Sequence, residues 1–238
     1  MENEFTKLSE ADREKYSSLH NSYPELGLVQ GIYKTNCYGF GKRLPGKSGI
    51  FFAMSRLNHS CRPNCERWWN DERKIETLYA LHDISTDEEL TVYYTNIVLC
   101  RDERQARLDE NWRFVCLCEC CRLTGEQRIL SDSRRERVKK TTESLESVVN
   151  ERNIVKRALL KVKMAIKDMQ DERLRGVVLA SLCYDGYQIS LLAKDLESAK
   201  KYIGMAHAEY LLGTGTDSFE TKRMKGFKKK PKSHQNWR

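Results

Sequence analysis

The feature that most constrains the fold of this chain is the run Phe114–Cys121, FVCLCECC, which places four cysteines within six residues. The chain opens with an acidic, polar segment and has no run of about 18 apolar residues, so we expect no signal peptide, no membrane span and an intracellular protein. In a reducing compartment, clustered cysteines bind metal more often than they form disulfides. The run therefore predicts a zinc site around which this part of the chain folds.

The spacing of the cysteines leaves the choice of zinc ligands open. Zinc takes four thiolate or imidazole ligands in a tetrahedron. Cys116 and Cys118 form a C-x-C pair that can place two sulfurs on one ion. Either Cys120 or Cys121 can add a third, and spacing alone does not decide between them. The fourth ligand must come from elsewhere in the chain.

A second group of ligand-capable side chains lies in the stretch Arg56–Cys65, RLNHSCRPNC, directly after the apolar run Ile50–Met54. Its two cysteines, Cys61 and Cys65, are the candidates for the fourth zinc ligand. The dense polar composition is also typical of a catalytic loop, or of a turn between two strands. The stretch therefore predicts a metal site, a catalytic loop or a turn.

The first half of the chain predicts an α+β fold. Ser9 precedes a helical pattern that runs through Tyr16 and Leu19, so we expect it to cap a helix. The apolar run at 50–54 predicts a strand or the start of a buried turn. CERWWN precedes KIETLYALHDI and EELTVYYT, whose period-two patterning predicts a small antiparallel meander. A charged helix, NIVLCRDERQARLDENW, is expected to follow it.

The second half predicts helices. Residues 131–213 contain no proline, and apolar residues recur there every three or four positions, which predicts three or four amphipathic helices. The segment Tyr187–Gly213 is typical of a tetratricopeptide hairpin. The predicted divisions are a helical segment at 1–49, the zinc-containing part at 50–125, a helical bundle at 131–213 and a basic tail at 214–238.

The tail holds the segment Lys222–Lys232, whose charged residues are all basic, in a chain with a formal net charge of +8. Such a run can bind acidic partners or serve as a nuclear address, which slightly favours the nucleus over the cytoplasm. It is equally typical of a disordered, solvated tail.

Three motifs together resemble a known family: Asn58–Asn64 (NHSCRPN), Glu89–Tyr94 (ELTVYY) and Phe114–Cys121 (F-x-C-x-C-x-x-C). Their order and spacing are similar to the C-terminal half of a SET domain with its post-SET zinc loop, as in fungal SET-domain proteins and the SET-and-MYND group. In that family a tetratricopeptide-like helical bundle follows. The N-H-S-C segment of the family threads beneath another stretch of chain to form a pseudoknot, a rare exception to unknotted topology.

The resemblance implies a protein-lysine methyltransferase that uses S-adenosylmethionine and acts on a protein substrate. The resemblance implies that Tyr94 is the catalytic tyrosine and that Asn58, His59 and Phe114 contact the cofactor. It also implies that Tyr93 and Trp112 line the substrate channel. The zinc ligands that it implies are Cys61, Cys116, Cys118 and Cys121. The resemblance therefore favours Cys121 over Cys120.

One family feature is expected to be missing. A SET domain begins with a G-x-G strand segment far upstream of N-H-S-C, whereas Gly39-Phe40-Gly41 lies in a predicted loop only shortly before it. We interpret these glycines as loop residues, so the first strands of the domain are expected to be absent. The alternative function is a catalytically inactive, zinc-stabilised module that binds a protein partner. Nucleic-acid binding is not expected, because the adjacent Trp68 and Trp69 should point to opposite faces of a strand.

Overall fold

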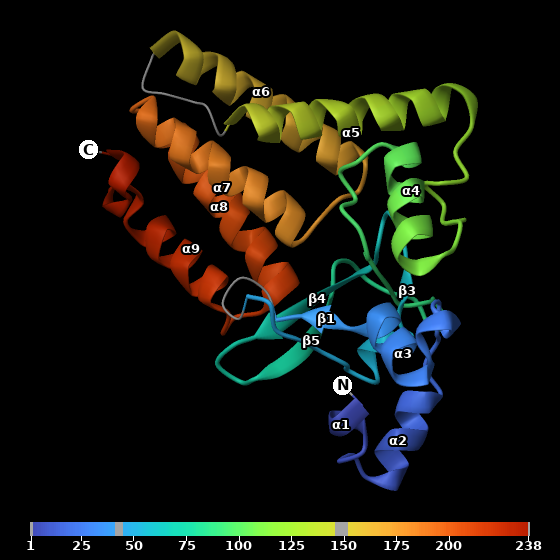
Figure 1. The fold of residues 1–238 in the computed structure, drawn as a ribbon. Helices are drawn as coiled ribbons and strands as arrows, with labels where there is room; N and C mark the ends of the chain where they lie inside the picture. The colour runs from blue at the N-terminus through green and yellow to red at the C-terminus, as the bar shows by residue number, and fades with distance from the viewer. Residues whose placement is uncertain (1, 41–44, 146–151, 238) are drawn as a thin grey trace.

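The computed structural model describes residues 2–40, 45–145 and 152–237. Figure 1 shows short helices and strands in the first part of the chain and a bundle of long helices in the second. The two parts are in contact because α8 of the bundle packs against β4 and β5. No helix in the described ranges has the length and apolar character needed to cross a bilayer.

The N-terminal helices pack around a small apolar core. They are α1 (Glu2–Phe5), α2 (Glu10–Ser17) and α3 (Leu28–Asn36). The Oγ atom of Ser9 accepts a hydrogen bond of 3.1 Å from the Asp12 amide, which confirms the predicted helix cap. Tyr16 and Leu19 bury against α3, whose C-terminal end leads directly into the candidate site.

Short strands pair two by two. The antiparallel pairs are β1 (Tyr38–Gly39) with β2 (Ser48–Gly49), and β4 (Cys65–Asn70) with β5 (Ile75–Ala80). The third pair, β3 (Asn58–His59) with β6 (Thr91–Val92), is parallel. The β4–β5 hairpin confirms the predicted pairing of CERWWN with the first residues of KIETLYALHDI.

The predicted three-stranded meander is wrong at its last strand. EELTVYYT contributes only two strand residues, and these pair with β3 rather than with β5. Period-two patterning shows that one face of a segment is buried, but it does not reveal which segment is the partner. Here the partner is β3, which lies upstream of the hairpin; the parallel β3–β6 pairing is called the crossing below.

The apolar run before β3 forms mainly a turn. Strand β2 ends at Gly49, and a 3₁₀ turn, η2, spans Met54–Arg56. Gly39 of the G-x-G sequence ends β1, whereas Gly41 lies outside the described residues. Trp68 and Trp69 are both half-buried, and the Trp69 ring packs 4.6 Å from the ring of Phe40.

Helices form the rest of the chain. They are α4 (Arg101–Trp112), α5 (Gly125–Leu145), α6 (Arg152–Asp171), α7 (Val177–Leu192), α8 (Leu196–Thr214) and α9 (Phe219–Lys229). The helical pattern predicted over 131–213 therefore corresponds to α5–α8, although residues 146–151 of that range lie outside the described residues. The largest apolar core lies among these helices, and Ile97 and Val98 of the first half join it.

The basic segment is not a disordered tail. It forms most of α9, which runs along the outside of α8 in Figure 1. Thr221 and Met224 are buried, and the ring of Phe227 lies 5.7 Å from that of Tyr187. These residues recur every three positions, so they form an inward-facing stripe that the lysine-rich composition conceals.

A buried carboxylate joins the two parts of the chain. Glu66 of β4 accepts hydrogen bonds from the Tyr93 hydroxyl, at 2.7 Å, and from the Val177 amide at the start of α7, at 3.1 Å. Gly176 adopts a φ of 71°, and a Cβ atom there would lie 2.6 Å from Glu66 Oε2, so the close approach requires glycine. Burial outweighs these hydrogen bonds and raises the pKa of Glu66 to about 7.

This pKa makes stability pH-dependent. The folded chain holds the Glu66 proton more tightly than the unfolded chain, whose pKa is near 4.5. The unfolding free energy should therefore fall as pH rises from 4.5 to about 7, by about 3 kcal/mol from this group. Glu66→Gln should lack this fall in urea unfolding measured across that range. Glu72→Gln, at an exposed position, should keep it, and equal pH slopes for the wild type and Glu66→Gln would contradict the assignment.

Candidate functional site

The parallel pairing of β3 with β6 places the N-H-S-C segment beside the end of the E-L-T-V-Y-Y segment. The Ser60 amide donates to the Val92 carbonyl at 2.9 Å, which extends the pairing beyond the two strands. Asn64 stabilises the crossing through two hydrogen bonds. Its Oδ1 atom accepts one from the Thr91 amide at 2.8 Å, and its Nδ2 atom donates one to the Glu89 carbonyl at 2.8 Å. The crossing brings together residues more than thirty positions apart.

Four cysteines converge on one side of this crossing. The sulfurs of Cys61, Cys116, Cys118 and Cys121 all lie within 4.8 Å of one another. The Cys61 and Cys121 sulfurs are 3.6 Å apart, close to the separation of about 3.8 Å for two sulfurs bonded at about 2.3 Å to a tetrahedral zinc ion. Hydrogen bonds from the neighbouring thiols, Cys116 first, hold the pKa of Cys118 far below its ordinary value. The donor set and its spacing therefore fit a zinc ion.

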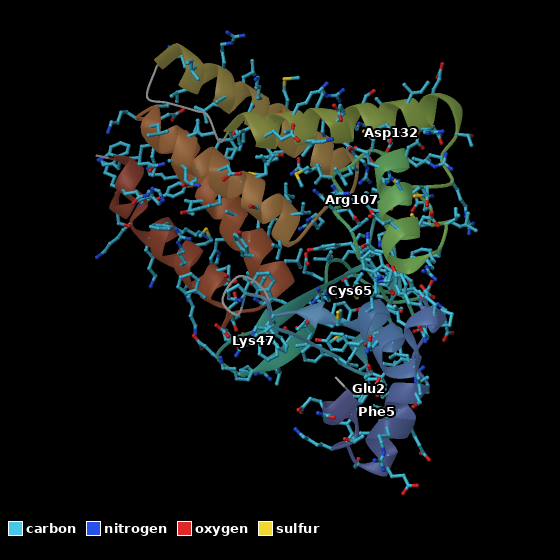
Figure 2. All side chains as sticks on the ribbon, in the orientation of Figure 1. Glu2, Phe5, Lys47, Cys65, Arg107 and Asp132 are labelled. Atoms are coloured by element: carbon cyan, nitrogen blue, oxygen red, sulfur yellow. The ribbon has the colours of Figure 1, made fainter. Side chains whose placement is uncertain are left out.

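Two cysteines that spacing left as candidates lie outside this group. The Cys120 sulfur instead accepts from Nη2 of Arg135 at 3.3 Å and from Nη2 of Arg104 at 3.5 Å. Cys65 is buried on β4 (Figure 2) and is not among the four convergent sulfurs. The geometry thus groups Cys121 rather than Cys120, and Cys61 rather than Cys65, with the C-x-C pair.

An aromatic cavity lies beside the cysteines. It has a volume of about 610 Å³, and α3, the crossing and the segment after α4 line it. The Tyr94 ring lies 5.3 Å from the Trp112 ring and 6.3 Å from the Phe114 ring. Tyr94, Trp112 and Phe114 thus come together in one wall, together with His59, whose ring lies 5.4 Å from Tyr94.

His59 connects the cysteines to this cavity. Its Nδ1 atom accepts a hydrogen bond of 3.0 Å from the Tyr94 amide, and its Nε2 atom lies 3.3 Å from the Cys61 sulfur. Burial lowers the pKa of His59 to about 4, so the ring is neutral at pH 7. Asn58, the preceding residue, is exposed at the cavity and donates to Glu89 at 2.6 Å.

The two adjacent tyrosines have different surroundings. The Tyr94 hydroxyl donates to the Leu57 carbonyl, and burial raises the pKa of Tyr94, which keeps the phenol neutral. Tyr93 also reaches the cavity lining, but its hydroxyl donates to Glu66, and burial again raises its pKa. Tyr94 is therefore the tyrosine whose hydroxyl lies near the crossing.

Sequence reasoning missed one wall of the cavity. Asn36, Cys37 and Tyr38 line it at the end of α3 and the start of β1. The Tyr38 hydroxyl donates to the Met54 carbonyl at 3.1 Å, and the Arg67 guanidinium lies 4.0 Å above the Tyr38 ring. The glycine-rich sequence that follows predicts a loop, and no local pattern marks these three residues as part of a site. A weak signal was the position of Tyr38 directly after an apolar helix.

Comparison with known proteins identifies the domain. The family model described as the SET domain matches residues 4–95, which include the N-terminal helices and the β3–β6 crossing but not the run Cys116–Cys121. The fission yeast histone-lysine N-methyltransferase set5 (Schizosaccharomyces pombe) is 27% identical over 233 residues, which cover 96% of this chain and 70% of that protein.

Other relatives match over shorter segments. Histone-lysine N-methyltransferase SET5 of Eremothecium gossypii is 42% identical over 73 residues, which make up 31% of this chain and 14% of that protein. Mouse histone-lysine N-methyltransferase SMYD3 is 30% identical over 129 residues, or 49% of this chain and 30% of that protein. The family match and these relatives agree on the family named by the sequence motifs. Residues 4–95 of the chain therefore match a SET domain.

Proposed function

We propose that this chain is a protein-lysine methyltransferase that takes S-adenosylmethionine in the aromatic cavity and holds zinc in the four-cysteine site. The observation that carries the proposal is the parallel pairing of β3 with β6, which places His59 between the Cys61 sulfur and the Tyr94 amide. The SET-domain match over residues 4–95 and the similarity to relatives named as histone-lysine methyltransferases support it.

The proposed zinc site has a structural role. A bound zinc ion supplies a tetrahedral cross-link between segments far apart in the chain. Cys61 would anchor the crossing, and Cys116, Cys118 and Cys121 would anchor the loop that follows α4. Since Phe114 and Trp112 precede that loop, fixing it would also fix the aromatic wall of the cavity.

The cavity suits a small-molecule cofactor. Its volume of about 610 Å³ lies within the usual range for such sites. S-adenosylmethionine supplies a methyl group on a positively charged sulfur. We assign Phe114 and the neutral His59 ring to packing against the adenine, and Asn58 to hydrogen bonding at the cavity mouth.

The residues around Tyr94 suit methyl transfer. The reaction is an in-line displacement, so the protein must hold an uncharged lysine amine behind the methyl group. The Tyr94 hydroxyl donates its hydrogen bond to the Leu57 carbonyl, which leaves the lone pairs of the phenol oxygen as acceptors for partly positive groups in transit. The ring of Trp112 beside it helps to exclude water, and a dry channel favours the neutral amine.

A second cavity offers a route for the protein substrate. It has a volume of about 400 Å³, lies between the β4–β5 hairpin and helices α7–α9, and shares Gly39, Arg67 and Tyr93 with the aromatic cavity. Trp68, Trp69 and Tyr210 line it, and its acidic lining residues are Asp71, Glu72, Asp217 and Glu220. Its aromatic and acidic lining suits a lysine-rich segment, with the tetratricopeptide-like pair α7–α8 as one wall.

The proposal is tested by methyl transfer to recombinant core histones. The zinc-loaded chain is incubated with methyl-labelled S-adenosylmethionine and histones, and modified lysines are identified by mass spectrometry. The expected product is a histone lysine that carries the added methyl group. A folded chain that binds S-adenosylmethionine but labels no histone would contradict the histone assignment. A folded chain that does not bind it at all would favour a non-catalytic interaction module.

A further inference from the structure

Two buried arginines lie against the four-cysteine site. Arg104 of α4 and Arg135 of α5 are each 1% exposed. Nε of Arg104 donates to the Cys61 sulfur at 3.0 Å, and its Nη2 atom lies 3.8 Å from the Cys121 sulfur. Nη2 of Arg135 donates to the Cys120 sulfur at 3.3 Å and to the Cys61 carbonyl at 3.4 Å. Both guanidinium groups therefore contact Cys61 and Cys120 directly.

These two charges differ in how they are neutralised. Arg135 pairs with the buried carboxylate of Glu172 at 3.2 Å, and Arg62 pairs with the same carboxylate at 2.9 Å. No carboxylate among the described residues forms an ion pair with Arg104; besides the Leu99 carbonyl, its hydrogen-bond partners are cysteine sulfurs. A guanidinium does not lose its proton in proteins, and an uncompensated buried charge costs several kcal/mol. Arg104 therefore requires negative charge on the sulfurs.

A zinc ion bound by four thiolates supplies that charge, because the thiolates outnumber the charges of the metal and leave the group doubly negative. A hydrogen bond from N–H to a metal-bound sulfur also fixes the position of that sulfur, as groups around metal ligands generally do. Arg104 meets both needs at Cys61, the ligand that comes from a distant part of the chain.

We propose that Arg104 is a positioning residue of the metal site, which neutralises the zinc tetrathiolate and holds the Cys61 sulfur in place through its Nε–H donor. This inference rests on the zinc site of the proposed function. Arg135 supports Arg104 by holding Cys120 away from the metal, and its ion pair with Glu172 connects the site to the end of α6 and the turn before α7.

The inference predicts how substitutions change zinc binding. Arg104→Met removes the charge and the donors but keeps a long apolar side chain, so zinc affinity should fall by about 10- to 100-fold. Arg104→Lys keeps the charge but loses the Nε–H donor and the planar fork, so its affinity should lie between those of the wild type and Arg104→Met. Arg107→Met is the matched control, because Arg107 is exposed on the same helix (Figure 2).

The test uses the full chain and two measurements. Competition with a chromogenic chelator gives zinc affinity, and cobalt substitution gives the sulfur-to-cobalt charge-transfer bands, which report hydrogen bonding to the sulfurs. Arg104→Met should lose affinity and shift these bands, whereas Arg107→Met should match the wild type. If Arg104→Met does not fold, the same comparison is made with Arg104→Lys. Wild-type affinity and bands in a folded Arg104 variant would overturn the inference alone. A wild-type chain that binds no zinc would overturn the zinc site and this inference with it.

Discussion

Tyr94→Phe is expected to reduce methyl transfer to histones by about 100-fold or more, while S-adenosylmethionine affinity changes by no more than about threefold. The substitution keeps the ring that packs against Trp112 and Phe114 and removes only the hydroxyl. That hydroxyl is held in place by the Leu57 carbonyl and is the acceptor we assign to the transfer path. Since the loss acts on the transition state, kcat should fall far more than KM rises.

The matched control is Tyr79→Phe. Tyr79 is a half-buried tyrosine on β5 that does not line the aromatic cavity. Its loss of a hydroxyl should leave both kcat and S-adenosylmethionine affinity near the wild-type values. Initial rates with radiolabelled cofactor and calorimetric titration give the two quantities for each variant. Full activity in Tyr94→Phe would exclude the assigned role of this hydroxyl.

Cys118→Ser is expected to remove zinc and to destabilise the chain by several kcal/mol. The Cys118 sulfur belongs to the convergent set, and a serine hydroxyl does not replace a thiolate as a zinc ligand. Because metal binding and folding are coupled at structural zinc sites, loss of the ion appears as lost unfolding free energy. Zinc content by mass spectrometry should fall from one ion per chain to a small fraction of that, and the urea midpoint should fall with it.

Cys120→Ser tests whether Cys120 is a zinc ligand or only a neighbour of the four-cysteine site. Cys120 is buried two positions away, but its sulfur faces Arg104 and Arg135. A serine there still accepts hydrogen bonds from both arginines, so this variant should keep one zinc ion per chain. If instead Cys120→Ser lost zinc and Cys118→Ser retained it, the four-cysteine grouping would be incorrect.

The parts of the fold that sequence predicts are those with local patterns. The Ser9 cap, the β4–β5 hairpin and the helices of the second half each have a repeat or a capping residue within a few positions. The β3–β6 pairing has no such pattern, since its strands are two residues long and separated by the hairpin. In the basic segment, the lysines obscured the buried Met224 and the half-buried Phe227.

The candidate site likewise has parts that local sequence patterns predict and parts that depend on the three-dimensional fold. Cysteine spacing indicates Cys116 and Cys118 but leaves Cys120 and Cys121 open. The family resemblance favours Cys121, and the three-dimensional geometry groups its sulfur, rather than that of Cys120, with the pair. The cavity wall at Asn36–Tyr38 escaped notice because its residues gain a role only when α3 packs beside the crossing. Arg104 belongs to the predicted charged helix, and its burial depends on contacts across the fold that no local pattern encodes.

Calorimetric titration of the zinc-loaded chain with S-adenosylmethionine tests the central claim most directly, because every assigned role depends on cofactor binding in the aromatic cavity. We expect saturable binding of one cofactor per chain with Kd in the micromolar range, and loss of that binding in a Phe114→Ala variant that remains folded and keeps its zinc. No saturable heat up to about 1 mM cofactor, with a folded and zinc-loaded wild-type chain, would contradict the account.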